Sequence, residues 1–431
     1  MATYKSYKDS GVKWLGQIPS HWGMGKMREF FSERKQLSQD GSETLLSVSE
    51  YSGITPSVND AGENVSRSAS LIGYKKCKST DLIINIMLAW KRGLGISDYD
   101  GIVSPAYCVF ETHNINPHYS NYLLRTDLYT AEFKRNSTGI IESRLRMYPD
   151  DFKNIVCIKP PMQEQEAIVA YLDKVTAEID RAIEAQQKMI DALNERKQII
   201  ITRAVTRGLN PDVPLRNSGI DSLGQIPEHW KVMKLGSLGV TSNGISNDAS
   251  YFGEGYPFVS YSDVYKNFSL PNEIRQLAKS SERDQMFFSV KRGDVFFTRT
   301  SETVDEIGFS SVCLKTIPQA VFAGFLIRFR PIENIIVPEF SKFYFRASCH
   351  RNYFVKEMNL VTRASLSQQL LKGLTVLLPP KSEQISISDY LNFKITSLDN
   401  YIETCKKMIS LLQERKQIII NEVVTGKKKV I

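Results

Sequence analysis

The chain has 431 residues, of which 42% are hydrophobic and 24% are charged, and its formal net charge is +8. This length and balance indicate two or three globular domains with sizeable cores rather than a disordered chain. No apolar stretch approaches the about 20 residues that a membrane span requires, and the positive charge is compatible with a polyanionic partner.

The N-terminal residues and the cysteines bear on the compartment and on metal binding. The chain starts Met1-Ala-Thr-Tyr-Lys-Ser6, without an apolar signal segment. Its cysteines are scattered, with no Cys-x-x-Cys pair and no histidine placed to complete a zinc site. We therefore expect a soluble cytoplasmic protein with reduced thiols and with no metal site. The six cysteines are Cys77, Cys108, Cys157, Cys313, Cys349 and Cys405.

Short apolar runs bounded by turn residues predict mixed α/β structure before residue 160. The runs 81–89 and 102–111 are typical of strands, and a helix is expected from about Ser120 to Lys134. A long helix should then run from Met162 to about Arg207, because this stretch lacks proline and glycine. Its predicted apolar seam is Ile168, Leu172, Val175, Ile179, Ala182, Met189, Leu193 and Ile200.

The second half of the chain repeats this order. Strands are expected at 294–298 and 321–330, and a helix from about Ser341 to Lys356. A second long helix follows Pro379-Pro380 and ends near Gly426, as the first ends near Gly208. Its predicted seam is Ile387, Leu391, Lys394, Leu398, Tyr401, Met408, Leu412 and Ile419.

The two halves are an internal repeat with shared ends and divergent middles. Residues 10–22 recur 208 positions later, and residues 160–201 recur in part 219 positions later. A fixed frame that holds two different inserts indicates two related but unequal readers. The matches are Ser10 to Trp22 with Ser218 to Trp230, Glu195 to Ile201 with Glu414 to Ile420, Asp81 with Asp294, Arg125 with Arg346, and Arg144 with Arg363.

Each long helix needs a long partner, because about 45 residues span roughly 65 to 70 Å. An antiparallel pair of the two repeats is expected, since the short connector 209–215 makes a parallel pair hard to close. Further apolar positions widen the stripe, and they pack either within the pair or against an outside helical partner. These positions are Ile183, Ile190, Ile199, Ile201, Ile402, Ile409, Ile418 and Ile420.

Arginine, lysine, serine and threonine in the loops are candidates for contact with a polyanion. Arginine can bond guanine in two places, and hydroxyl groups can reach bases or phosphates. A single arginine is more often solvated or salt-bridged, so the repeated placement carries the interpretation. The candidates are Lys91, Arg92, Ser104, Ser143, Arg144 and Arg146 in the first half, and Thr298, Arg299, Thr300, Ser301, Thr362, Arg363 and Ser365 in the second.

Motifs of enzyme chemistry are missing from the sequence. There is no phosphate-binding loop, no Gly-x-Gly-x-x-Gly, no His-Glu-x-x-His and no nucleophile elbow. The segment Pro149 to Lys153 is interpreted as a turn that enters a strand, and the repeated His21 and His229 as structural. We expect a non-enzyme with no catalytic residues and no cofactor of its own.

These features resemble the specificity subunits of type I restriction-modification systems over nearly the whole chain. The resemblance rests on the doubled Leu-Gly-x-Ile-Pro-x-His-Trp opening, on Asp81 to Asn85 with Ile102 to Ala106, and on Gly293 to Ser301. It rests also on Pro-Pro-x-x-Glu-Gln at the head of each long helix. One departure concerns the family's tetrapeptide spacer repeat, which occurs once, as Thr176 to Ile179, so that no gap length can be read from it.

The resemblance implies an α+β fold with a pseudo-two-fold repeat, in which an antiparallel coiled coil separates two target recognition domains. Each domain would read one half of a bipartite, asymmetric site in double-stranded DNA, and the helices would set the gap. It also implies two methylation subunits, which bring S-adenosylmethionine, and restriction subunits, which use ATP and magnesium. The implied domains are 1–159, a first helix 160–208, 209–378 with linker 209–215, and a second helix with a basic tail at 379–431.

Three other interpretations remain open from the sequence. The chain could be the specificity component of a restriction-methylation enzyme of another type. It could be an autonomous architectural or regulatory DNA-binding protein, or a coiled-coil scaffold that carries two peptide-binding heads. Salt-dependent affinity for duplex DNA would count against the scaffold.

Overall fold

The computed structural model describes residues 3–57, 71–220, 223–300, 307–358 and 365–430. The chain forms two compact units, and each long helix contributes one part to each unit. Unit 1 comprises Met1–Gln187 with Lys407–Ile431, and unit 2 comprises Lys188–Lys406. Because the division falls inside the helices, the domain boundaries predicted above stay a prediction.

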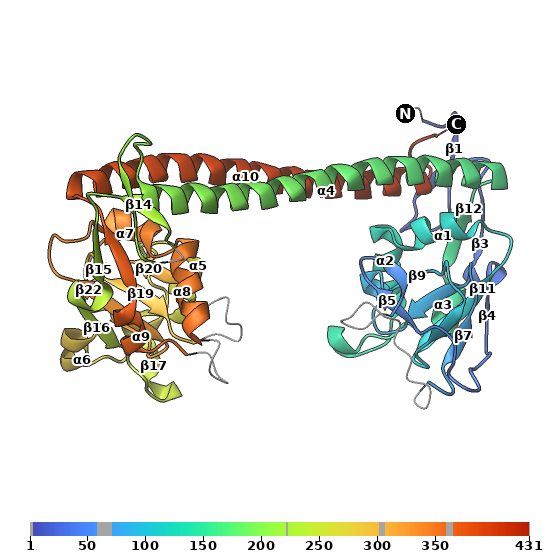
Figure 1. The fold of residues 1–431 in the computed structure, drawn as a ribbon. Helices are drawn as coiled ribbons and strands as arrows, with labels where there is room; N and C mark the ends of the chain where they lie inside the picture. Colours follow the sequence, from blue (N-terminus) through green and yellow to red (C-terminus); the bar gives the residue numbers. More distant parts are fainter. Residues whose placement is uncertain (1–2, 58–70, 221–222, 301–306, 359–364, 431) are drawn as a thin grey trace. The chain divides into compact units, whose positions relative to one another are not determined.

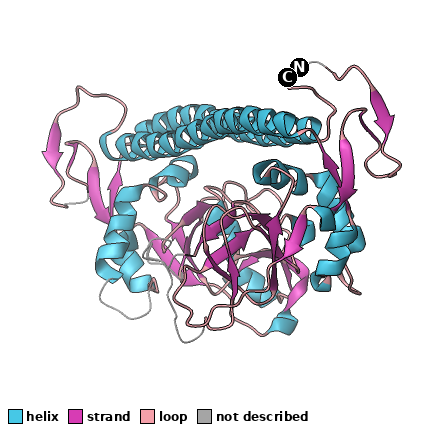
Figure 2. Cartoon of the chain, turned by 90° about the vertical axis from the view of Figure 1, so that its right-hand side faces the viewer, coloured by secondary structure: helices cyan, strands magenta, loops and turns pink. Residues whose placement is uncertain are grey.

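Unit 1 is built around a four-stranded antiparallel sheet in the order β4-β11-β8-β9. Strand β8 is buried along its whole length, as its uninterrupted apolar sequence Leu82-Ile-Ile predicts. Helices α1 and α2 pack their aromatic residues into the same core, where Tyr119, Tyr129 and Phe133 are almost fully buried. Figures 1 and 2 show the sheet and the helices of this unit.

The elements of unit 1 follow the chain from residue 7 to the first part of α4. They are β1 Tyr7–Asp9, β2 Gln17–Pro19, β3 Gly23–Lys26, η1 Met27–Glu29, β4 Phe31–Glu33, β5 Leu46–Ser49, β6 Gly53–Pro56, β7 Lys75–Cys77, β8 Leu82–Asn85, η3 Ala89–Lys91, β9 Leu94–Ile96, β10 Gly101–Val103, β11 Tyr107–Thr112, α1 Pro117–Leu124, α2 Asp127–Asn136, η4 Glu142–Arg144, α3 Pro149–Asn154, β12 Val156–Lys159 and α4 Met162–Arg207.

Unit 2 has an equivalent four-stranded sheet in the order β16-β22-β19-β20. The pairing register is the same in both sheets: Phe110 lies opposite Glu33 in unit 1, and Phe329 lies opposite Thr241 in unit 2. These are the positions that the sequence offsets of 219 and 208 place in correspondence. Unit 2 has in addition the strands β17, β18 and β21, which lie over a separate apolar cluster.

The elements of unit 2 end with α10, whose last part belongs to unit 1. They are β13 Leu215–Asn217, β14 Gln225–Pro227, β15 Lys231–Lys234, η5 Leu235–Ser237, β16 Gly239–Asn243, η6 Ala249–Tyr251, β17 Phe252–Val259, α5 Tyr261–Lys266, β18 Leu277–Ala278, α6 Glu282–Phe287, β19 Val295–Thr298, β20 Ser310–Val312, β21 Val321–Phe322, β22 Leu326–Pro331, α7 Pro338–Tyr344, α8 Ser348–Met358, α9 Gln368–Gly373, β23 Thr375–Leu378 and α10 Lys381–Val424.

The long helices α4 and α10 pair in an antiparallel direction within each unit (Figure 1). In unit 1, Lys416 donates to Asp180 at 2.7 Å, and in unit 2, Lys197 donates to Asp399 at 2.6 Å. Moving from Asp180 to Lys197 advances 17 residues along α4, and moving from Lys416 to Asp399 goes back 17 residues along α10. Both ion pairs therefore belong to one antiparallel register, and the predicted coiled coil is confirmed.

Part of the predicted apolar seam is wrong. Met189, Tyr401 and Met408 are 53%, 62% and 45% exposed, and Lys394 is exposed too. Their neighbours Ile190, Ile395 and Ile402 are buried instead, each at 6% exposure. The predicted heptad count drifts because a helix of 3.6 residues per turn does not keep a strict seven-residue repeat in register over its length.

Two local predictions are also corrected. The helix expected from Ser120 to Lys134 is interrupted, because the Thr126 side chain accepts a hydrogen bond from the Tyr129 amide and starts α2 anew. The helix expected from Ser341 to Lys356 is likewise divided into α7 and α8. The segment Pro149 to Lys153 lies in the short helix α3, with its proline at the first turn, rather than in a turn.

Candidate nucleic-acid interface

In both units, the loop after the central strand is joined to a second loop by the same backbone hydrogen bond. In unit 1 the Met147 amide donates to the Ile86 carbonyl at 2.8 Å, and in unit 2 the Leu366 amide donates to the Arg299 carbonyl at 2.8 Å. The offsets between these positions are those of the sequence repeat. The segments that carry most of the candidate residues therefore meet at one edge of each sheet.

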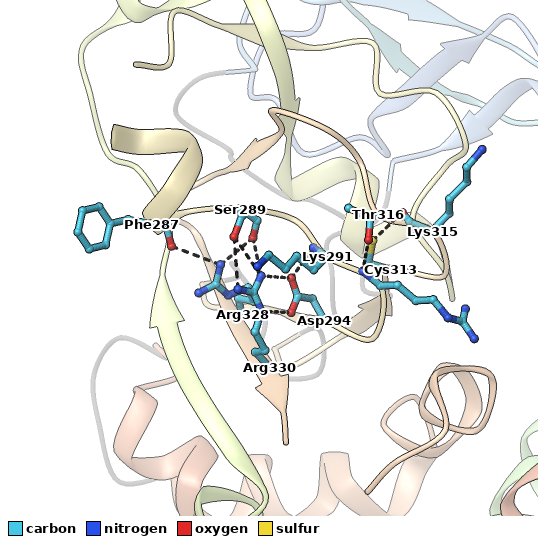
Figure 3. A network of polar contacts seen from close by, with 10 residues as sticks. Phe287, Ser289, Lys291, Asp294, Cys313, Lys315, Thr316, Arg328 and Arg330 are labelled. Carbon is cyan, nitrogen blue, oxygen red and sulfur yellow. Dashed lines mark hydrogen bonds and ion pairs between the residues drawn. The ribbon is translucent and has the colours of Figure 1, made fainter. Parts of the chain in front are cut away.

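A buried aspartate before the central strand holds the base of this edge. The Lys78 amide donates to Asp81 at 2.8 Å, and the Lys291 amide donates to Asp294 at 2.7 Å. Each carboxylate also accepts from an arginine at 2.6 Å, because a buried carboxylate needs a charged partner. Figure 3 shows Asp294 with Lys291 and with this arginine, Arg330.

The arginine comes from a different strand in each unit. Arg34 follows β4 and pairs with Asp81, whereas Arg330 lies on β22 and pairs with Asp294. The position of unit 1 that corresponds to Arg330 is Glu111, whose carboxylate lies 3.6 Å from Arg34. The ion pair is therefore kept while its cation has moved to the neighbouring strand.

The loop after β8 holds Lys91 and Arg92 in different ways. The Lys91 ammonium lies 4.8 Å from the centroid of the Trp90 ring, over which Lys134 also lies at 5.1 Å. Arg92 pairs with Asp127 and donates to the Arg125 carbonyl at 3.0 Å. Lys91 thus stays exposed to a ligand, while Arg92 is engaged in holding the loop to α2.

The loop between α2 and α3 carries Ser143, Arg144 and Arg146. Arg144 lies in the short helix η4, and Arg146 forms an isolated β-bridge with Thr138. Both arginine side chains are exposed, and the Ser143 side chain lies outside the described residues. Ser104 lies in the turn between β10 and β11, half-buried, where its hydroxyl accepts from the Ala106 amide at 3.4 Å.

In unit 2 the structure brings some of the candidates together and removes one from the surface. Thr298 is fully buried at the end of β19, so its side chain belongs to the core. Thr300 and Ser365 form an antiparallel bridge, and the half-buried Arg299 lies beside them. Ser301, Thr362 and Arg363 lie outside the described residues.

One exposed aromatic residue at this edge was missed from the sequence. Phe325 lies in the turn between β21 and β22, is 64% exposed, and accepts a hydrogen bond from the Arg299 amide at 2.9 Å. It borders an open hollow of about 770 Å³ lined also by Phe252, Tyr261 and Arg275. A lone phenylalanine in an apolar run gives no signal in the sequence, because exposure depends on the turn.

The repeated histidines join the entry of each unit to the start of a long helix. His21 Nε2 lies 2.8 Å from Glu164 of α4, and His229 Nε2 lies 2.6 Å from Glu383 of α10. In unit 2 the indole of Trp230 donates to the same Glu383 at 3.0 Å. Both pairs are contacts between elements, as the structural interpretation predicts.

Large apolar side chains are exposed on the outer surface of α10 in both units. In unit 2 these are Phe393 and Tyr401, at 72% and 62% exposure, and in unit 1 Leu411 and Ile418, at 60% and 47%. Exposed apolar residues repeated along a helix are typical of a protein interface. No helix among the described residues is long and apolar enough to cross a membrane.

The chain is similar to known specificity subunits. Residues 227–412 match the family model described as the type I restriction modification DNA specificity domain. The Escherichia coli K12 subunit of the EcoKI enzyme is 26% identical over 67% of this chain, and the match spans 60% of that subunit's length. The MjaVIII specificity subunit of Methanocaldococcus jannaschii is 23% identical over 98% of this chain and 97% of its own length.

Two solved structures share the fold. One, from work on complex assembly and conformational transition of the type I restriction-modification system, has a TM-score of 0.69 with 16% identity, over 94% of this chain and 98% of its own. The other, the HsdS subunit from Thermoanaerobacter tengcongensis, has a TM-score of 0.50 with 17% identity, over 97% of this chain and 100% of its own. Together with the doubled frame and the antiparallel helices, these similarities place the chain in the family of type I restriction-modification specificity subunits.

Proposed function

We propose that this chain is the DNA sequence-recognition subunit of a type I restriction-modification complex. Each unit reads one half of a bipartite, asymmetric site in double-stranded DNA. The observation that carries the proposal is the loop edge, which is built on the same sheet and the same buried aspartate in both units but presents different side chains. One scaffold with two different reading surfaces suits a duplex, whose two half-sites offer similar backbones and different bases.

The chain acts without catalysis or a cofactor of its own in this proposal. Two methylation subunits supply S-adenosylmethionine and the methyl transfer, and restriction subunits supply ATP-driven translocation and cleavage with magnesium. The exposed apolar residues of α10 offer a docking surface for the methylation subunits, one in each unit. The complex works in the cytoplasm, where its DNA substrate is.

Methylation profiling of a host with and without this chain tests the proposal. We expect one bipartite motif to be methylated only when the chain is present. Exchanging residues 86–92 and 138–146 for the loops of another family member should change the first half of the motif and leave the second half as it was. If no motif depends on the chain, the proposed function is rejected.

A salt titration separates DNA reading from peptide binding. Affinity of the complex for a duplex that carries the motif should fall linearly with the logarithm of the salt concentration, with a slope of about −0.9 for each phosphate contacted. The variant with Phe393 and Tyr401 changed to serine should keep its fold and lose the methylation subunit in co-purification. A variant of the exposed Met286 on α6, which lies away from α10, serves as the matched control.

A further inference from the structure

Two isoleucines form an exposed apolar tip on the loop between α2 and α3. Ile140 is 101% exposed and Ile141 is 52% exposed. Figure 1 shows this loop, drawn in turquoise, projecting from the body of unit 1. A fully exposed β-branched residue at a loop tip contributes nothing to the core of its own unit, so its apolar surface is available to a ligand.

The tip is held by backbone hydrogen bonds on both sides. Thr138 and Arg146 exchange two hydrogen bonds, at 2.9 and 3.0 Å, and close the loop at its base. Within it, the Arg144 amide donates to the Ile141 carbonyl at 2.9 Å and forms the helical turn η4. A side chain at Gly139 would lie 2.6 Å from the Arg144 carbonyl, so this position needs glycine. The isoleucines are therefore presented on a defined support.

The charge around the tip is positive. Arg144 and Arg146 are exposed on the same loop, whose single acidic residue, Glu142, is paired with Lys134 of α2. Lys134 also lies over the Trp90 ring, next to Lys91. An apolar tip surrounded by arginine and lysine matches the surface of nucleic acid, where phosphates flank stacked bases, better than the apolar face of a protein.

We propose that Ile140 and Ile141 form a wedge that inserts between stacked base pairs of the first half-site. Arg144 and Arg146 bind the flanking phosphates and hold the wedge in place. The inference deepens the proposed function, because it assigns to unit 1 a reading mode based on deformation of the DNA. Steps that unstack easily, such as pyrimidine–purine steps, are then preferred where no side chain bonds to a base edge.

Fluorescence of 2-aminopurine measures the unstacking directly. The full-length chain, with the methylation subunit that it retains, is mixed with synthetic duplexes of the motif found by methylation profiling. The 2-aminopurine is placed at each position of the first half-site in turn. We expect a several-fold rise in fluorescence at one step, which the variant with both Ile140→Ala and Ile141→Ala abolishes, together with about ten-fold weaker affinity.

The control variant is Ile332→Ala, because Ile332 is 54% exposed but lies in unit 2, away from the candidate loops. It should keep both the fluorescence change and the affinity. If the wild-type complex binds its motif with no change in fluorescence, or if the double variant binds equally well, the wedge is rejected while the proposed function stands. If the double variant instead loses the methylation subunit, the tip is a protein-docking site and the wedge is likewise rejected. A wild-type complex that does not bind duplex DNA rejects both.

Discussion

Lys197 of α4 and Asp399 of α10 form an ion pair at 2.6 Å in which the lysine side chain is 14% exposed and the carboxylate 49%. The pair ties together two helices that are 202 residues apart in the sequence. Lys342 of α7 lies close to it, and burial together with the charge of Lys197 lowers the Lys342 pKa. Asp399 therefore balances two lysines at the place where the helix pair meets the domain of unit 2.

Reversing one charge of this pair should destabilise unit 2. Lys197→Glu places two carboxylates side by side, and we expect the melting temperature to fall. The double variant Lys197→Asp with Asp399→Lys should recover most of the loss. A double-mutant cycle is expected to give a coupling of about 0.5 to 1 kcal/mol, because the carboxylate is half exposed. A coupling of zero would show that packing alone holds the helices together here.

Lengthening α4 should change the spacer of the DNA motif and neither half-sequence. An insertion of four residues after Thr176 adds about one helical turn, roughly 6 Å. Because the register of α4 against α10 is antiparallel, the insertion moves the two readers apart along the helix pair in the proposed function. Methylation profiling reads the result. Altered half-sequences with an unchanged spacer would contradict it.

The two neighbouring candidates Arg92 and Arg144 should separate stability from DNA binding. Arg92→Ala removes an ion pair and a backbone contact, so we expect a loss of about 1 to 2 kcal/mol in the free energy of unfolding. Arg144→Ala leaves the fold intact. It should cost about 1 to 3 kcal/mol of affinity for the motif if it reads a base, or reduce the salt slope by about 1 if it binds phosphate. Melting curves and salt titrations of both variants distinguish the two roles.

The buried His350 should make unit 2 sensitive to acid. The imidazole is 2% exposed, and burial lowers its pKa from 6.5 to about 4. A base whose pKa is lower in the folded state stabilises the fold above its unfolded pKa, and this contribution is lost as the pH falls from 6.5 to about 4. The full loss is on the order of 3 kcal/mol.

Replacing this histidine tests the assignment. His350→Gln should flatten the decline of the melting temperature over that pH range, although it also perturbs the ring contact with Tyr344 at 4.5 Å. His118→Gln, at an exposed position of unit 1, is the matched control and should leave the decline as in the wild type. A parallel decline in all three proteins would assign the acid sensitivity to other groups.

Thiol labelling should find one reactive cysteine of the six. Cys77, Cys108, Cys157, Cys313 and Cys349 are buried, and burial raises the pKa of each thiol, for example to about 11 in Cys108 and to about 12 in Cys313. Cys405 is half-exposed on α10. Because the thiolate is the reactive form, a chromogenic disulfide should react quickly with Cys405 and with the others only after denaturation. Cys405→Ser should then give no fast phase.

Much of the fold could be predicted from the sequence because the repeat supplies a second reading of every frame residue. The recurrence of Asp81 as Asp294 marks the buried carboxylate before the central strand, and the absence of proline and glycine marks both long helices. The seam was harder to predict, since Met189 and Ile190 are both apolar and their burial depends on the rotation of one helix against the other. Hydrophobicity alone cannot distinguish such neighbours.

The candidate site was predictable as a set of loops but not residue by residue. Arg92 and Arg144 look alike in the sequence, yet one pairs with Asp127 and the other is exposed, because this depends on the direction in which each loop turns. Thr298 shows the opposite error: it directly precedes an arginine in a polar tetrapeptide but closes a buried strand. The candidates that reach a ligand depend on loop geometry, which local sequence does not encode.

The exchange of Arg34 for Arg330 limits how such chains can be recombined. A chimera that transplants strand β4 or β22 by itself would leave a buried aspartate with no cation, or crowd two guanidinium groups around one carboxylate. A transplant that carries the whole sheet keeps donor and acceptor together. New specificities should therefore arise more readily by shuffling complete domains than by patchwork replacement of single strands.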